Sequence, residues 1–169
     1  MKRRDQSKGV LIWITGFSGS GKTTLANGIK KKVIKKYGPT LVINGDNLRK
    51  IFKLNKYDKN SRLVYVKQYG KFLKFITNQG INVIFTVVGM FHNIRRWNRK
   101  NFSNYIEIYI KTNISKIKKK RKKALYLKKT NHIVGVQIKP ELPKKPDIVL
   151  INDFKKNLKQ LSEDLIKKI

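Results

Sequence analysis

Residues 16–24 of the chain read GFSGSGKTT and fit the pattern G-x-x-x-x-G-K-[ST]. The glycines let the backbone curl until successive N–H groups point at phosphate oxygens, and the helix that follows adds the positive end of its dipole. The lysine of this pattern reaches the β and γ phosphates, and the next hydroxyl ligates Mg²⁺. We therefore predict that the stretch binds ATP and that Thr23 also ligates Mg²⁺. The predicted ATP-binding residues are Gly16, Ser18, Gly19, Ser20, Gly21, Lys22, Thr23 and Thr24.

A second polar stretch, GDNLR at residues 45–49, directly follows the apolar run TLVIN. The carboxyl ends of parallel strands share one edge of a sheet, where such folds bind ligands, so we expect this stretch beside the phosphate-binding loop. The Asp46 carboxylate can accept the proton of an attacking hydroxyl or hold Mg²⁺ through water. Arg49 can grip an anionic acceptor with two N–H groups. A helix cap made by Asp46 or Asn47 is a compatible structural role.

Five apolar runs that suit buried strands position these motifs, at residues 10–15, 40–44, 81–88, 105–110 and 147–152. They alternate with helix-like segments at residues 22–36, 61–78, 93–100, 114–123 and 155–169. Strands and helices in alternation predict a parallel sheet that is covered on both faces. The predicted fold is therefore α/β, a doubly wound parallel sheet of about five strands of the P-loop NTPase type, in one domain over residues 1–169.

One segment, residues 128–145, lacks both strand and helix character and contains Gly135 and two of the four prolines. A stretch of this length without regular structure in a small domain is typical of a functional loop or of a disordered segment. The strand-like run that follows favours an ordered loop. We therefore predict a lid at about residues 124–146.

The chain is strongly basic, with 41 lysines and arginines against 9 aspartates and glutamates and a net charge of +32. Such a surface attracts polyanions, so nucleic acid, anionic membrane and phosphate-rich metabolites are all candidate partners. The lysines are scattered through every segment, which favours solvated helix faces over a dedicated basic arm. The densest run, KIKKKRKK at residues 116–123, is interpreted as a helix end that leads into the lid. We expect no specific nucleic-acid partner.

Several kinds of site are disfavoured by what the chain lacks. Cysteine is absent, which excludes disulfides and thiolate chemistry, and the two histidines, His92 and His132, have no metal-ligand spacing. No apolar run approaches the roughly 20 residues that span a bilayer, and the basic start leads into the phosphate-binding loop, so we expect a cytoplasmic protein without a membrane partner. Motor ATPases usually have an acidic residue at the end of an apolar strand to hold Mg²⁺, but none follows the run at residues 81–88. This difference favours a small phosphotransferase.

At this point the sequence resembles the adenylylsulfate kinase family. The family pattern G-[LF]-S-G-S-G-K-[ST]-T is matched by residues 16–24, and D-G-D-N-x-R is matched by residues 44–49 except at its first position. Three later stretches, YIEIYIKT, KRKKALY and GVQIKPELPKKPDIVL, are loosely similar to the family's strand and lid sequences. The resemblance covers nearly the whole chain, and two of its motifs are specific.

The resemblance implies transfer of the γ-phosphoryl group of ATP to the ribose 3′-hydroxyl of a nucleotide acceptor. It implies that Lys22, Asp46 and Lys123 are catalytic, with Lys123 approaching the transferring group from the lid. Thr23 and Asp46 would hold Mg²⁺. The resemblance to the family also suggests a homodimer. Such catalysis consists mainly of positioning and charge neutralisation.

The departures from the family cluster on the acceptor side. Asn44 replaces the first Asp, and the family's R-x-E-N-x-R-R becomes RLVYVKQ, which keeps Arg62 but loses the arginine pair. The family's I-S-P-x-R loop becomes VGMFH, and the lid aromatic that stacks on adenine is Val134 here. A lost stacking ring forgoes about 1–3 kcal/mol of base contact, and Lys and Gln cannot form the bidentate fork of arginine.

We therefore expect an intact donor half and a rebuilt acceptor half. Divergent members of the family are encoded with bacterial capsule genes, and the implied acceptor is cytidine diphosphoramidate. The alternatives are adenylylsulfate, phosphorylated to 3′-phosphoadenylylsulfate in sulfate activation, and a basic nucleic-acid-binding ATPase. The residues expected to contact the acceptor are Asn47, Arg49, Tyr57, Arg62, Tyr65, Phe91 and Val134.

The aromatic residues leave some assignments open. Tyr57 and Tyr65 form either a wall of the acceptor site or part of the packing between helix and sheet. Phe91 follows a strand end on the ligand edge and is a candidate for the missing stacking ring. Tyr69 and Phe72 fall at core-like spacing, so we expect them to be structural.

Overall fold

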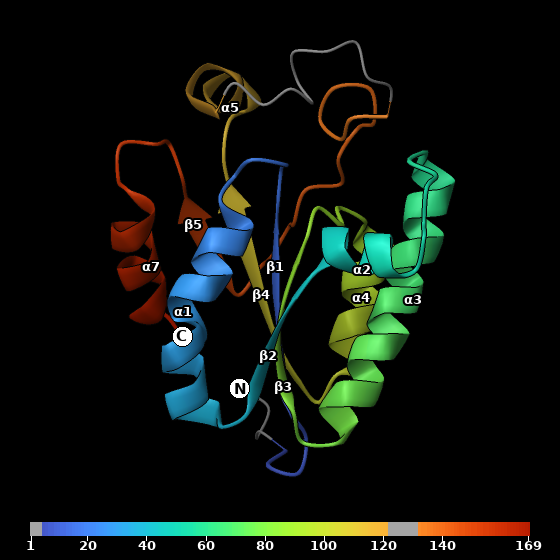
Figure 1. The fold of residues 1–169 in the computed structure, drawn as a ribbon, viewed down its shortest axis with the longest axis vertical. Helices are drawn as coiled ribbons and strands as arrows, with labels where there is room; N and C mark the ends of the chain where they lie inside the picture. Colours follow the sequence, from blue (N-terminus) through green and yellow to red (C-terminus); the bar gives the residue numbers. More distant parts are fainter. Residues whose placement is uncertain (1–4, 122–131) are drawn as a thin grey trace.

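The computed structural model describes residues 5–121 and 132–169. These residues contain a five-stranded sheet, drawn in Figure 1. Its order is β2-β3-β1-β4-β5, and all four neighbouring pairs are parallel. The strands span Val10–Gly16 (β1), Thr40–Asn44 (β2), Asn82–Val87 (β3), Asn104–Lys111 (β4) and Ile148–Ile151 (β5). The predicted α/β doubly wound sheet is confirmed, with strand ends within one residue of the apolar runs.

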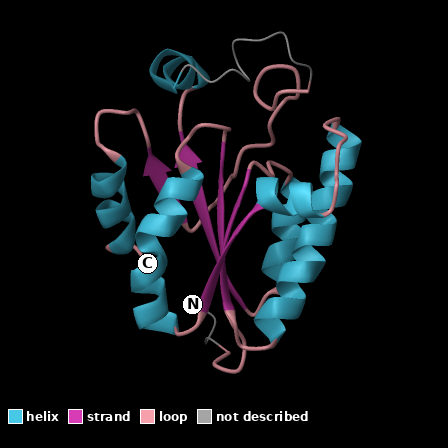
Figure 2. Ribbon diagram, viewed as in Figure 1, coloured by secondary structure: helices cyan, strands magenta, loops and turns pink. Residues whose placement is uncertain are grey.

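Helices cover both faces of the sheet (Figures 1 and 2). One layer contains α1 (Lys22–Tyr37) and α7 (Leu158–Ile166), and the other contains α2 (Gly45–Ile51), α3 (Lys59–Asn78) and α4 (His92–Asn101). A further helix, α5 (Ile114–Arg121), lies beyond the carboxyl ends of the strands (Figure 1). The short helix α2 falls outside the helix-like segments expected from the sequence, and α7 is shorter than the segment expected at residues 155–169.

The central strand β1 shows why the sheet is buried on both sides. All seven of its residues are buried, and successive side chains point to opposite faces. Val10, Ile12 and Ile14 join the apolar cluster under α1 and α7. Leu11 and Trp13 join the cluster under α2, α3 and α4. A continuous apolar strand between two helical layers is the arrangement that parallel sheets require.

The carboxyl edge of the sheet brings the two predicted motifs together. The phosphate-binding loop follows β1, and α2 begins directly after β2, two strands away in the sheet. A small apolar cluster lies at this edge and joins loop, strand end and α5 through Phe17, Met90, Tyr109, Ile117 and Ile133.

The predicted lid is described only in part. Residues 132–146, which we call the strap, cross the carboxyl edge, whereas residues 124–131 and Lys123 lie outside the described residues. The strap turns tightly at Gly135, whose N–H donates to the Ile138 carbonyl at 2.8 Å. Gly135 has a φ of 89°, and a Cβ there would lie 2.7 Å from Cε1 of Phe17. The strap therefore packs directly against the phosphate-binding loop.

Within residues 5–121 and 132–169, no helix is long and apolar enough to cross a membrane.

Candidate active site

The phosphate-binding loop has the backbone that its glycines permit. Gly19 and Gly21 have φ values of 85° and 94°, in the left-handed region that favours glycine. Gly21 precedes the first residue of α1, so the helix dipole points its positive end into the loop. Lys22 Nζ donates to the carbonyl oxygens of Gly16 and Phe17 at 3.0 and 2.9 Å. The lysine thus lies over the concave side of its own loop.

Strand β5 supports the loop from behind. Asn152, which directly follows β5, is buried and donates from Nδ2 to the Ser20 carbonyl at 3.0 Å. Ser20 is itself fully buried. This hydrogen bond orients the peptide after Ser20, so the N–H of Gly21 is held on the opposite side of the chain. Sequence reasoning missed Asn152, because only the tertiary fold brings residues 20 and 152 together.

Asp46 lies in the first turn of α2 and is exposed. The cap of this helix is Asn44, whose Oδ1 accepts the N–H of Asp46 at 2.8 Å. The expected cap by Asp46 or Asn47 is therefore wrong, because the helix already begins at Gly45 and has both residues inside it. Nδ2 of the same Asn44 donates to Thr23 Oγ1 at 2.8 Å. One side chain thus connects the start of α1 with the start of α2.

The donors around Thr23 and Asp46 fit a magnesium ion that is shared with a nucleotide. Mg²⁺ is usually held by one or two carboxylates, several waters and the substrate phosphates. Thr23 offers a hydroxyl and Asp46 a carboxylate at the same edge of the sheet. No cluster of three or more His, Cys, Asp or Glu side chains occurs in the described part of the chain, so an all-protein metal cage is absent there.

Arg49 and Arg62 hold the connection between α2 and α3. Nη1 of Arg49 donates to the carbonyls of Leu54 and Lys56 at 3.1 and 2.8 Å. Nε of Arg62 donates to the Tyr57 carbonyl at 2.6 Å, and its Nη2 donates to the carbonyl of residue 132 in the strap at 3.1 Å. Arg62 therefore ties the strap to the α2–α3 connection.

The two arginines also gather positive charge. Burial, followed by the charge of Arg49, lowers the pKa of Arg62, although Asp46 and Asp58 act in the opposite direction. The centroid of the Tyr57 ring lies 4.5 Å from the guanidinium carbon of Arg49 and 5.4 Å from the guanidinium carbon of Arg62. An anion bound between the arginines would relieve their mutual repulsion.

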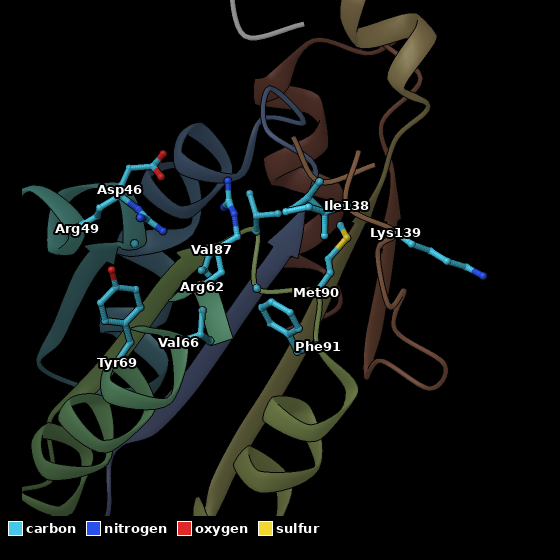
Figure 3. A pocket seen from close by; sticks show the side chains of 14 residues that line it. Asp46, Arg49, Arg62, Val66, Tyr69, Val87, Met90, Phe91, Ile138 and Lys139 are labelled. Atoms are coloured by element: carbon cyan, nitrogen blue, oxygen red, sulfur yellow. The ribbon is translucent and has the colours of Figure 1, made fainter. Parts of the chain in front are cut away.

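A cavity of about 40 Å³ lies between α2, α3, the end of β3 and the strap (Figure 3). Five of the predicted site residues line it, and three of them, Asp46, Arg49 and Arg62, are labelled on the left of Figure 3. Phe91 and Val134 complete the five. Ligand pockets typically measure about 300–1,000 Å³, so the cavity as it stands is too small to enclose a whole nucleotide.

The remaining predicted acceptor residues do not line this cavity. Asn47 is exposed on α2, and Tyr57 is exposed over the two arginines. Tyr65 is half-buried against the core and lies 5.1 Å from the Arg49 guanidinium carbon. Phe91 is only 6% exposed, because it packs into the same core cluster while one side borders the cavity.

The two aromatics expected to be structural differ. Tyr69 is buried, as expected, and it also borders the cavity. Phe72 is 38% exposed, so the expectation that it packs in the core is wrong. Its ring instead meets that of Phe52 edge-on, with centroids 6.3 Å apart. The helical spacing predicted that Phe72 lies on the buried face of α3, but the residue lies at the edge of that face.

Glu141 anchors the strap and was missed by sequence reasoning. Its Oε2 accepts the N–H of His92, the first residue of α4, at 2.6 Å. Its backbone N–H donates to the Met90 carbonyl at 3.2 Å, and its carbonyl accepts from Arg95. A carboxylate at a helix N-terminus is stabilised by the unpaired N–H groups and by the dipole. The strap is therefore pinned at the same strand end that borders the cavity.

Sequence reasoning also overlooked the tetrapeptide Asn55–Asp58, which reads N-K-x-D, the pattern with which GTPases recognise guanine. It lies in the connection between α2 and α3. The Asp58 carboxylate accepts the N–H of Ser61 at 2.9 Å and caps α3. The structure thus gives this aspartate a local role at a helix start.

Comparison with known proteins decides the family. The model of the family "Adenylylsulphate kinase" matches residues 8–151, which include both motifs and the whole strap. The chain belongs to the adenylylsulfate kinase family. This confirms the resemblance seen in the sequence, and the kinase homologues support a phosphotransferase that uses ATP.

Relatives within the adenylylsulfate kinase family differ in their named substrates. The chain is 37% identical over 163 residues to the cytidine diphosphoramidate kinase of Campylobacter jejuni, with 94% of this chain and 95% of the relative covered. It is 31% identical over 169 residues to the adenylyl-sulfate kinase of Prochlorococcus marinus, with 96% and 84% covered. Among solved structures, the Mycobacterium tuberculosis APS kinase CysC in complex with AMPPNP and APS has a TM-score of 0.82 at 22% identity. The alignment covers 95% of this chain and 97% of that chain, and it supports the fold.

Proposed function

We propose that this protein is an ATP-dependent kinase that phosphorylates the ribose 3′-hydroxyl of cytidine diphosphoramidate. The observation that supports this acceptor most strongly is the 37% identity to the Campylobacter jejuni enzyme over nearly the full length of both chains. The adenylyl-sulfate kinase of Prochlorococcus marinus reaches 31%. The product would be used to decorate capsule sugars with phosphoramidate. Because the donor is ATP, we assign the reaction to the cytoplasm.

The proposed reaction needs little covalent chemistry from the protein. The 3′ oxygen attacks the γ phosphorus, the bond from that phosphorus to the β–γ bridging oxygen breaks, and ADP leaves. Asp46 would accept the proton of the attacking hydroxyl. Lys22 and the loop N–H groups would hold the phosphates, and bound Mg²⁺, held by Thr23 and Asp46, would neutralise phosphate charge. The role of Lys123 from the lid stays a prediction.

The acceptor side supplies an anion site and an apolar wall. Arg49 and Arg62 are close to one another and to Asp46, so they are suited to the diphosphate portion of an acceptor that presents its ribose to the carboxylate. Phe91 and Val134 provide apolar surface for a base on the far side of the cavity. Tyr57, beside Arg49, and Asn47, exposed on α2, would contact the part of the acceptor that lies outside the cavity. These contacts are our proposal for acceptor binding.

Adenylylsulfate is the second candidate acceptor, because the family model and the Prochlorococcus marinus relative are both named as adenylylsulfate kinases. The third reading, a basic nucleic-acid-binding ATPase, is not proposed. Part of the basic run lies in α5, over the carboxyl edge of the sheet, and the kinase relatives cover almost all of the chain. The homodimer suggested by the family remains a proposal.

The position of phosphorylation can be tested with deoxy analogues of the acceptor. We expect the 2′-deoxy analogue of cytidine diphosphoramidate to be phosphorylated and the 3′-deoxy analogue to be inert, because only the latter lacks the attacking oxygen. ADP release and mass spectrometry of the product would measure both reactions. Phosphorylation of the 3′-deoxy analogue at a rate near that of the parent compound would contradict transfer to the 3′-hydroxyl.

A further inference from the structure

Asn44 forms two hydrogen bonds that join the two halves of the candidate site. It is the last residue of β2 and the cap of α2, with extended backbone angles. Its Oδ1 accepts from the Asp46 N–H at 2.8 Å, and its Nδ2 donates to Thr23 Oγ1 at 2.8 Å. The backbone of Asn44 is fixed by its register opposite Thr86 in β3. A side chain on a rigid strand end therefore spans the gap between Thr23 and Asp46.

The chemistry of its partners determines the orientation of the Asn44 amide. The backbone N–H of Asp46 can only donate, so the amide oxygen must face it. The amide nitrogen, which can only donate, then faces the Thr23 hydroxyl oxygen. Thr23 accepts one hydrogen bond and keeps one lone pair and its own hydrogen for other partners. The direction of this hydrogen bond thus follows from the helix cap.

We propose that Asn44 is a positioning residue that presents the second lone pair of Thr23 to a nucleotide-bound Mg²⁺. This inference rests on the ATP site proposed above and is independent of the acceptor. Groups that orient metal ligands through hydrogen bonds typically change metal affinity about 10–100-fold when they are removed. Asn44 also holds the start of α2, so Thr23 and Asp46 keep a constant relation to one another.

Two substitutions separate the functions of this side chain. In Asn44→Ser the hydroxyl can still cap α2, but the shorter side chain cannot also reach Thr23. In Asn44→Asp the carboxylate can still accept from the Asp46 N–H, but towards Thr23 it can only accept. The Thr23 hydrogen would then turn to the carboxylate, and a second negative charge would stand near the metal.

The test measures binding of AMPPNP by calorimetry in Mg²⁺ and in EDTA. The ratio of the two dissociation constants reports how much Mg²⁺ strengthens nucleotide binding. We expect Asn44→Ser to lower this ratio about tenfold, because Thr23 loses its orienting partner. Thr23→Ala should lower the ratio as well, and adding Asn44→Ser to it should cause little further loss. Asn44→Asp should raise the ratio about threefold or more, since the carboxylate strengthens the Thr23 ligand and adds charge.

An Asn44→Ser protein with a ratio equal to that of the wild type would overturn the proposal, even if both dissociation constants changed. Equal changes in Mg²⁺ and in EDTA would mean that Asn44 only supports the fold. An Asn44→Asp ratio at the wild-type value would also overturn the proposal, because a carboxylate at this position would then act neither on the Thr23 ligand nor on the metal. If the wild-type protein bound no AMPPNP at all, the ATP site itself would fail, whereas a failure of the acceptor proposal leaves this measurement untouched.

Discussion

Replacing Asp46 by asparagine is expected to lower kcat about 10²–10⁴-fold, which is the usual contribution of a general base. The amide has nearly the size of the carboxylate but cannot take the proton of the attacking hydroxyl. The cap of α2 should survive, because the backbone N–H of residue 46 makes the hydrogen bond to Asn44. Steady-state ADP release with saturating acceptor measures the loss, and circular dichroism verifies the fold.

Asp164→Asn is the matched control for this substitution. It makes the same chemical change on α7, where Asp164 pairs with Lys156 on the other face of the sheet. We expect this variant to keep the wild-type kcat. An Asp46→Asn protein with kcat within threefold of the wild type would place the catalytic base elsewhere.

Lys22→Ala is expected to lower kcat/KM for ATP about 10²–10³-fold, the range found when one preorganised donor to developing charge is removed. In the structure the ammonium group contacts the carbonyls of Gly16 and Phe17, over the loop where the phosphates would bind. The phosphoryl oxygens would receive this charge during transfer. Initial rates over a range of ATP concentrations measure the effect.

Lys31→Ala removes the same charge from an exposed residue of α1 and should leave kcat/KM unchanged. The pair of variants therefore separates a specific phosphate contact from the general attraction of a chain with net charge +32. If both variants lost activity equally, the overall field of the protein rather than Lys22 would account for ATP binding.

The strands and both polar motifs could be predicted because the information is local. Apolar runs of four to eight residues are typical of buried parallel strands, and the fixed spacing of GFSGSGKTT specifies a loop and the start of a helix. Parallel topology then brings all strand carboxyl ends to one edge. Asp46 and Arg49 were therefore expected beside the phosphate-binding loop, whereas Arg62 was expected on the acceptor side from the family resemblance. All three border one cavity at that edge.

The contacts that define the acceptor side could not be predicted, since they join residues far apart in the chain. Glu141 caps a helix that begins 49 residues earlier, and Arg62 reaches a carbonyl 70 residues later. Helical spacing placed Phe72 on the buried face, but the packing of α3 leaves it at the rim beside Phe52. Asn44 was recognised only as a departure from the family pattern, and its two hydrogen bonds became visible with the fold.

We propose that the departures from the family pattern on the acceptor side serve a different acceptor. The most direct test is ADP release from ATP and Mg²⁺ with cytidine diphosphoramidate and with adenylylsulfate, compared as kcat/KM under the same conditions. We predict a value about tenfold or more higher for the cytidine compound, a ratio that differences in pocket contacts can supply. A higher value for adenylylsulfate would contradict the account and make the protein an enzyme of sulfate activation.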